Sequence, residues 1–181
     1  MFVLINGAFG VGKTSVAREL RRLVPGSVIY DPEPVGVVLQ HVHRRPVSDF
    51  QDLALWRRLT VTAARALAAV RSPVIMPMAF SNADYLNEIR AGLAMSGQPV
   101  LHFCLTAPLD VLRERLTRRG EPLGEPRWAW VHRRAEECCS AHEDALFATH
   151  VSTDSRPPSA VAADLAERIT SPSFFGPGPW S

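Results

Sequence analysis

Residues 7–14 read Gly-Ala-Phe-Gly-Val-Gly-Lys-Thr, which matches the phosphate-binding pattern G-x-x-x-x-G-K-[ST]. The apolar run at residues 2–6 before it predicts a buried strand, and the apolar spacing of residues 14–23 after it predicts a helix. The pattern requires this strand, loop and helix context. We therefore expect a nucleotide-binding loop formed by Gly7, Ala8, Phe9, Gly10, Val11, Gly12, Lys13 and Thr14.

The residue types of this loop suit ATP with Mg²⁺. Glycines let backbone N–H groups turn toward a phosphate, and the positive end of the following helix faces the same anion. Lys13 is the single lysine of the chain, and it can reach the outer phosphates as a catalytic cation, while the Thr14 hydroxyl can ligate Mg²⁺. The alternative interpretation is a glycine-rich turn with a solvated lysine.

Composition bounds the rest of the molecule. The chain has 181 residues, of which 46% are hydrophobic and 21% charged, as expected for one globular domain. A formal net charge of +2 does not favour a nucleic-acid partner, and there is neither a signal peptide nor an apolar run of membrane-spanning length. The three cysteines, Cys104, Cys138 and Cys139, favour neither a disulfide framework nor a zinc knuckle. We therefore expect a cytoplasmic protein.

Strands are predicted to alternate with helices along the chain. The strands are expected at residues 2–6, 27–30, 73–80, 99–106 and 150–153, and the helices at 14–23, 35–43, 50–70, 82–95, 109–119, 129–147 and 159–170. This alternation predicts an α/β protein with a five-stranded parallel sheet and helices on both faces, in which ligands lie at the carboxyl ends of the strands. The expected division is a domain over residues 1–170, with a lid at about 120–128, and a Pro/Gly-rich tail over 171–181.

The positions of acidic residues narrow the class of phosphate-loop protein. A guanine-specific GTPase needs a second lysine, which the chain lacks, and the strands at 73–80 and 99–106 contain no acid of the kind that motor-type and AAA ATPases use. The strand at 27–30 is instead followed directly by Asp31. This arrangement resembles small-molecule kinases of the nucleoside-monophosphate-kinase-like group, with a three-layer fold.

Two carboxylates are expected beside the outer phosphate. Asp31 can accept the proton of an acceptor hydroxyl or bind the waters of Mg²⁺, and Glu33 is the second candidate for either role. The alternative for Asp31 is a carboxylate that initiates a turn before a proline.

Three arginines are candidates for anion contacts. Arg57 shares the inward stripe of the predicted helix at 50–70, so we expect it to pair with Asp31 or Glu33 or to bind a substrate phosphate. A structural ion pair is the alternative. Arg115 and Arg119 lie four residues apart before the predicted lid, and such a pair can clamp ATP phosphates during transfer. A solvated basic helix end is the alternative interpretation for that pair.

A wider set of segments resembles the tunicamycin resistance protein family of bacteria and, more distantly, chloramphenicol phosphotransferase. The segments are residues 6–14, Tyr30-Asp31-Pro32-Glu33, Asp49-Phe50-Gln51, Leu55-Trp56-Arg57, Pro77-Met78, Tyr85-x-Asn87-Glu88-Ile89, His102-Phe103-x-Leu105 and Thr153-Asp154. The resemblance implies an ATP-binding protein that confers resistance to a nucleoside antibiotic by phosphorylating it. Family members can carry a longer basic C-terminus, so we expect no stable membrane association here.

The sequence thus predicts an enzyme that moves the γ-phosphoryl group of ATP to a hydroxyl of a small, nucleoside-like acceptor. The expected acceptor contacts are Asp31, Glu33, Phe50, Gln51, Arg57 and Phe80. Two alternatives stay open: a protein that sequesters drug with ATP but without turnover, and a nucleoside or nucleotide kinase of primary metabolism. The expected assembly is a monomer or a homodimer.

Overall fold

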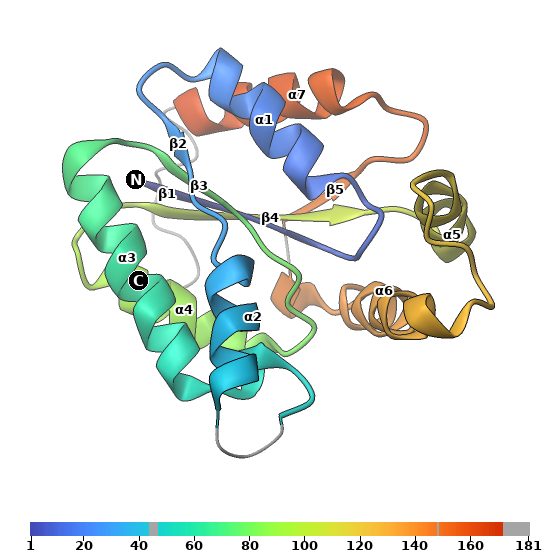
Figure 1. The fold of residues 1–181 in the computed structure, drawn as a ribbon. Helices are drawn as coiled ribbons and strands as arrows, with labels where there is room; N and C mark the ends of the chain where they lie inside the picture. Colours follow the sequence, from blue (N-terminus) through green and yellow to red (C-terminus); the bar gives the residue numbers. More distant parts are fainter. Residues whose placement is uncertain (44–46, 148, 172–181) are drawn as a thin grey trace.

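Five parallel strands form one sheet in the order β2-β3-β1-β4-β5 (Figure 1). The computed structural model describes residues 1–43, 47–147 and 149–171. The strands are β1 (Phe2–Gly7), β2 (Val28–Ile29), β3 (Val74–Pro77), β4 (Val100–Thr106) and β5 (His150–Ser152). The helices are α1 (Lys13–Leu23), α2 (Glu33–Val42), α3 (Ala54–Val70), α4 (Ala83–Ala94), α5 (Leu109–Arg118), α6 (Ala129–Ala141) and α7 (Pro158–Thr170). Short 3₁₀ turns occur at η1 (Phe50–Asp52), η2 (Pro126–Trp128) and η3 (Ala145–Phe147).

The central strand β1 is apolar on both faces because each face carries its own core. Val3 and Ile5 point into a cluster with residues of α1 and α7, whereas Phe2 and Leu4 point into a second cluster with residues of α3 and α4. Figure 1 shows α1 and α7 over one face of the sheet and α3 and α4 over the other. The predicted three-layer α/β fold is therefore confirmed. Within the described residues, no helix has the length and apolar character needed to cross a membrane.

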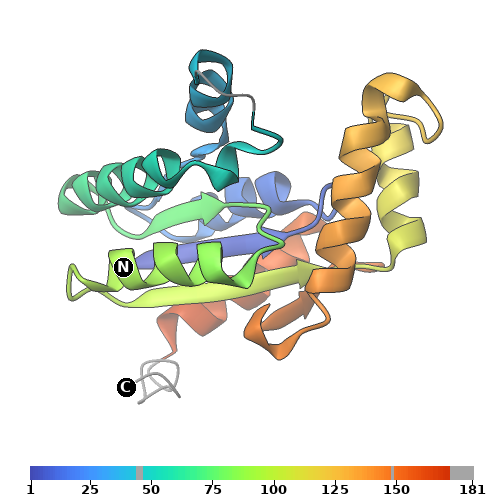
Figure 2. The same cartoon turned by 90° about the horizontal axis from the view of Figure 1, so that it is seen from below.

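The strand order reverses beside β1, which lies between β3 and β4. In parallel sheets of this kind, ligands bind at the carboxyl ends of the strands where the order reverses. The loop after β1 and the end of β3 at Pro77 therefore meet at the expected binding edge. α5 and α6 stand side by side at this edge and are joined by the segment that contains η2 (Figure 2).

Two predicted helix boundaries are wrong. The helix expected at 50–70 begins only at Ala54, because the Asp49 side chain accepts the Gln51 N–H at 2.9 Å and caps a separate turn, after which Leu53 is extended. The helix expected at 129–147 ends at Ala141, and the Asp144 side chain then accepts the Leu146 N–H in a further turn. The predicted tail, apart from Ser171, lies outside the described residues.

A buried polar cluster joins β1 to the chain that leaves β3. The Asn6 Oδ1 accepts the Phe80 N–H at 2.8 Å, and the Asn6 Nδ2 donates to the Phe80 carbonyl at 3.2 Å. The His142 Nε2 lies 2.7 Å from the same carbonyl, so this nitrogen carries the proton and donates it. His142 is 3% exposed, and burial lowers its pKa to about 4.

We predict that His142 makes the fold less stable in mild acid. An unfolded histidine takes up a proton near pH 6.5, whereas the folded His142 stays neutral down to about pH 4, so stability is lost as the pH falls between these values. The expected loss between pH 7 and pH 4.5 is about 2.4 kcal/mol. Urea unfolding of the wild type and His142→Gln at pH 7 and pH 4.5 measures it, because the variant lacks this titration. Equal pH dependence in both proteins would contradict the assignment.

Candidate active site

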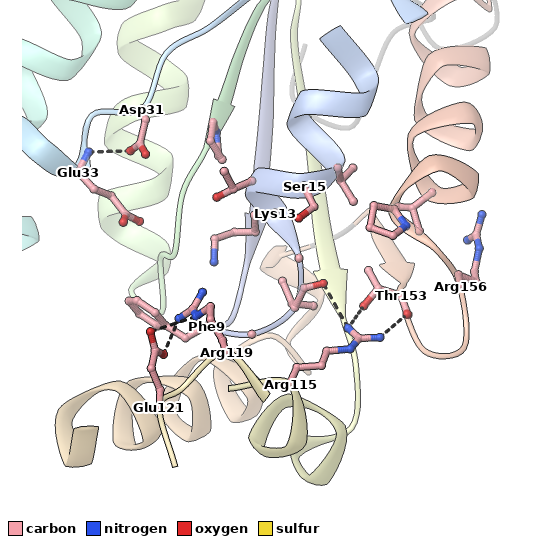
Figure 3. Close-up of a pocket in the computed structure, with 18 residues that line it drawn as sticks. Phe9, Lys13, Ser15, Asp31, Glu33, Arg115, Arg119, Glu121, Thr153 and Arg156 are labelled. Carbon is pink, nitrogen blue, oxygen red and sulfur yellow. Dashed lines mark hydrogen bonds and ion pairs between the residues drawn. The ribbon is translucent and has the colours of Figure 1, made fainter. Parts of the chain in front are cut away.

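A cleft of about 640 Å³ lies at the carboxyl ends of the strands (Figure 3). Figure 3 shows Lys13 between Asp31 and Glu33 on one side and Arg115 with Thr153 on the other. The lining residues come from the loop after β1 with the start of α1, the segment from β2 to the start of α2, the end of β3, α5 with the residues after it, and the segment from β5 into α7. They are Phe9, Gly10, Val11, Gly12, Lys13, Thr14, Ser15, Val16, Asp31, Glu33, Pro77, Arg115, Arg119, Glu121, Thr153, Arg156, Pro158 and Val161.

The loop after β1 presents an uncapped helix N-terminus to this cleft. Gly12 precedes α1 in a left-handed conformation with φ +100°, and no side chain caps the helix. A Cβ at Gly12 would meet nothing within 4 Å, whereas one at Gly10 would lie 2.9 Å from the Leu112 carbonyl oxygen. The first turn of α1 contains no acid. This end of α1 therefore has the backbone geometry and positive dipole that bind a phosphate.

The expected loop residues divide into those that face the cleft and those that support it. The six residues from Phe9 to Thr14 line the cleft. Gly7 and Ala8 lie behind it: a Cβ at Gly7 would approach the Leu105 carbonyl oxygen to 2.9 Å, and Ala8 is 2% exposed. The Ala8 carbonyl still takes part, because it accepts a hydrogen bond from the Lys13 Nζ at 3.0 Å.

Lys13 is the cation at the centre of the cleft. Its Nζ lies 5.3 Å from the centre of the Phe9 ring, close enough for a cation–π contact. Burial lowers the pKa of Lys13, and the carboxylate of Glu33 acts in the opposite direction. Lys13 can therefore serve as a local positive charge for the outer phosphates of a nucleotide.

Asp31 and Glu33 follow β2 in a turn that two hydrogen bonds fix. The Asp31 Oδ1 accepts the Glu33 N–H at 3.0 Å, and the buried Trp56 donates its Nε1–H to the Pro32 carbonyl at 3.0 Å. Burial raises the pKa of Glu33, while Lys13 opposes that rise. Both acids line the cleft, and Glu33 also lines a second cavity beside it.

The second cavity has a volume of about 130 Å³ and adjoins the cleft at Phe9 and Glu33. Phe50 and Gln51, which we expected at the acceptor site, line this cavity. Asp49 and Arg134 also line it and are joined by an ion pair of 3.3 Å. The complete lining is Phe9, Glu33, Val37, Asp49, Phe50, Gln51, Trp130 and Arg134.

Arg115 and Arg119 both line the cleft but have different partners. The Arg115 guanidinium donates to the Thr153 carbonyl at 2.8 Å and to its hydroxyl at 3.0 Å. Arg119 instead forms a two-bond pair with Glu121, at 3.0 and 2.6 Å. Arg115 is thus held by uncharged oxygens, whereas Arg119 is neutralised by a carboxylate.

Two sequence predictions about acceptor contacts are wrong. Arg57 does not pair with Asp31 or Glu33, because its Nε donates to Glu88 at 2.6 Å and its guanidinium stacks on the Tyr85 ring at 4.1 Å. Phe80 is fully buried and packs beside Trp56 in the core, so its side chain lines neither the cleft nor the second cavity.

The residues present fit a magnesium ion that is held mainly by a nucleotide. Thr14 is exposed at the start of α1 and lines the cleft, so its hydroxyl can ligate the ion. Among the described residues, no group of three or more His, Cys, Asp or Glu side chains could hold a metal ion. Mg²⁺ ordinarily keeps several waters and binds through substrate phosphates, which agrees with this donor set.

Asp49, Trp130 and Arg134 line the second cavity, although none of them was among the expected site residues. Arg134 lies in an arginine pair on α6 with no motif around it, and Asp49 was expected only as part of a segment that carries the family resemblance. The usable signal was the helical phase of α6, which separates the nearly buried Arg134 from the exposed Arg133.

Comparison with known proteins agrees with this geometry. The model of a family described as "AAA domain" matches residues 2–138. The solved tunicamycin resistance protein of Deinococcus radiodurans is 31% identical, with 93% of this chain and 95% of that chain covered and a TM-score of 0.75.

Two further solved structures share the fold at lower identity. A sugar kinase from Janibacter sp. HTCC2649 is 18% identical over 91% of each chain, with a TM-score of 0.64. A gluconokinase from Sinorhizobium meliloti 1021 is 17% identical over 97% of each chain, with a TM-score of 0.60. Curated protein sequences give no match.

We predict that Arg57 supports stability. In Arg57→Ala the Gln51 carbonyl, which accepts an Arg57 hydrogen bond at 2.5 Å, loses its buried donor. Since Glu88 is 44% exposed, its pairing contributes little, and the expected loss is about 1–2 kcal/mol.

Urea unfolding measures the loss of stability in Arg57→Ala. Arg58→Ala is the matched control, because Arg58 is exposed on the same helix and its replacement should change stability by less than about 0.5 kcal/mol. Equal stability of both variants and the wild type would remove the structural role of Arg57.

Proposed function

The chain belongs to the AAA domain family and to the tunicamycin resistance protein family, and on this basis we propose that it transfers the γ-phosphoryl group of ATP to a hydroxyl of a small, nucleoside-like acceptor. Tunicamycin is the first acceptor to test, because the relative from Deinococcus radiodurans is named for resistance to it. One observation carries the proposal: the cleft and the second cavity meet at Glu33, beside Lys13.

ATP is proposed to bind along the cleft with its phosphates at the loop after β1. The N-terminus of α1 and Lys13 would hold the outer phosphates, and Thr14 would contribute to Mg²⁺, which supplies charge neutralisation between the β- and γ-phosphates. Arg115 adds a fixed positive charge at the cleft wall. Arg119 would bind the phosphates once its ion pair with Glu121 has broken.

The transfer step assigns the proton to Glu33. The oxygen of the acceptor hydroxyl forms a bond to the γ-phosphorus, the bond from that phosphorus to the bridging oxygen breaks, and ADP departs with the electron pair. The hydroxyl proton passes to the Glu33 carboxylate, whose pKa is raised by burial and thereby better matched to a base role. Asp31 lines the cleft but not the second cavity, so we assign it the role of binding the waters of Mg²⁺.

Binding of a drug with ATP but without turnover is the second candidate. Pro77 lies at the end of β3 and lines the cleft, at a place where motor ATPases carry an acid. A proline in place of that acid favours slow hydrolysis of ATP, which agrees with sequestration of the drug without turnover. Mass spectrometry of tunicamycin recovered after incubation with ATP separates the two functions, since transfer adds one phosphoryl group and sequestration adds none.

We predict that Lys13→Ala weakens ATP binding by at least about tenfold, equivalent to about 1.4 kcal/mol, because the outer phosphates lose a charged donor. Calorimetric titration with ATP and Mg²⁺ measures this change. Arg18→Ala, an exposed change on the same helix, is the control and should bind ATP normally. Unchanged affinity in Lys13→Ala would reject the phosphate-loop assignment.

We predict that Glu33→Gln lowers phosphoryl transfer by about 10²-fold, the lower end of the usual contribution of a general base, with ATP binding nearly intact. Since the Glu33 pKa is raised, the wild-type rate should climb with pH until this carboxyl is ionised, and the variant should lack that rise. Rates of labelled phosphate transfer over pH 5–8 test this.

Asp31→Asn is the matched comparison for Glu33→Gln. It should weaken the dependence of the rate on Mg²⁺ concentration while keeping the rise with pH. If Asp31→Asn removes the rise and Glu33→Gln keeps it, the two assignments must be exchanged.

A further inference from the structure

In the part of the chain that the structure describes, the second cavity has a single cation in its wall, and carboxylates already pair with it. Arg134 extends from α6 with 12% of its side chain exposed. One guanidinium nitrogen lies 3.3 Å from the Asp49 Oδ2, and another donates to Glu137 at 2.8 Å and to the Ser81 hydroxyl at 3.0 Å. The third nitrogen, Nε, is buried without a hydrogen-bond partner among the described residues, so Arg134 keeps one N–H for a ligand atom while two carboxylates balance its positive charge.

The other charged groups of this wall are carboxylates. Glu33 and Asp49 both line the cavity, and burial raises the pKa of each. Asp49 is fixed in place by the Gln51 N–H as well as by Arg134. With Arg134 balanced by Asp49 and Glu137, the remaining charge of the cavity is negative, which disfavours an anionic ligand.

Nearby arginines do not change this balance within the described part of the chain. Arg57 is bound to Glu88 and to the Gln51 carbonyl and does not line the cavity. Arg119 lines the cleft rather than the cavity and is paired with Glu121. Lys13 interacts with Glu33 but lines the cleft and not the second cavity, and the proposed function has the phosphates of ATP balance its charge.

The uncharged walls of the cavity suit a ring. Phe9 and Trp130 meet edge to face at 5.5 Å, and Phe50 lies across Trp56 at 4.9 Å. The volume of about 130 Å³ equals the share of roughly four waters in the liquid, which is room for one ring-sized moiety. Aromatic faces favour such a moiety through burial and stacking.

We propose that the second cavity selects an uncharged acceptor, with one ring among Phe9, Phe50 and Trp130 and a hydroxyl toward Glu33, and that the carboxylates around Arg134 reject phosphorylated and carboxylated acceptors. The inference rests on the proposed function and names its acceptor class, which is a nucleoside or a similar neutral ring compound. A nucleoside monophosphate and a sugar acid fall outside this class.

Binding of matched pyrimidine ligands tests the selection. Uridine and uridine 5′-monophosphate are titrated by calorimetry into the full chain saturated with a non-hydrolysable ATP analogue and Mg²⁺. We expect uridine to bind at least about tenfold more tightly than the monophosphate. Equal or tighter binding of the monophosphate would overturn the proposal, and binding of neither ligand up to about 10 mM would overturn its nucleoside assignment.

A charge-removing variant tests the cause. Asp49→Asn keeps an oxygen that can cap the turn but releases Arg134 from one carboxylate, so the preference for uridine should shrink by about tenfold. Asp52→Asn is the matched control, because Asp52 lies in the same turn, accepts hydrogen bonds from Ser48 and Tyr85 and does not line the cavity. An unchanged preference in Asp49→Asn, or an equal loss in both variants, would contradict the assigned cause.

Transfer assays on the same samples distinguish this inference from the proposed function. A preference for uridine without transfer to any acceptor would overturn the transferase and leave the selectivity intact. Efficient transfer to the monophosphate would leave the transferase intact and overturn the selectivity.

Discussion

The buried side chain of Asn6 determines how the two halves of the site are held together. It binds both the N–H and the carbonyl of Phe80, which is 74 residues away along the chain. Asn6 directly precedes the phosphate loop, and Phe80 follows the strand beside it in the sheet. A buried amide with two satisfied hydrogen bonds specifies one spacing between these segments, because any displacement would leave polar groups unpaired in the core.

The two arginines of the cleft differ in whether a carboxylate neutralises their charge. Arg115 is bound to the carbonyl and hydroxyl of Thr153, so its charge is not cancelled and its position is fixed. The positive charge of Arg119 is neutralised by Glu121, whose side chain is 15% exposed. A phosphate chain that enters the cleft meets a permanent field from Lys13 and Arg115, and it must compete with Glu121 for Arg119. The charge that the cleft offers to an anion therefore depends on Glu121 as well as on Lys13 and the two arginines.

The geometry of the loop after β1 could be predicted from the sequence because that loop is local. Residues 7–14 form it with their backbone, so a spacing pattern predicts the geometry, and the alternating apolar runs predict the sheet around it. The acceptor side depends on distant segments, and spacing cannot predict their register. Arg57 was correctly expected to be buried, but its partner Glu88 lies on another helix, and the break at Leu53 places Phe50 in a separate turn from the helix that contains Arg57.

The second cavity is assembled around the segment at residues 79–81. Gln51 donates to the Ala79 carbonyl at 3.1 Å, His142 donates to the Phe80 carbonyl, and Arg134 donates to the Ser81 hydroxyl. Because Asn6 fixes this segment relative to the phosphate loop, the turn at η1 and the helix α6 receive their positions from it. Side chains on η1 and α6 that face the cavity can therefore vary without moving the phosphate loop. The geometry of the loop after β1 is thus independent of the side chains that line the second cavity.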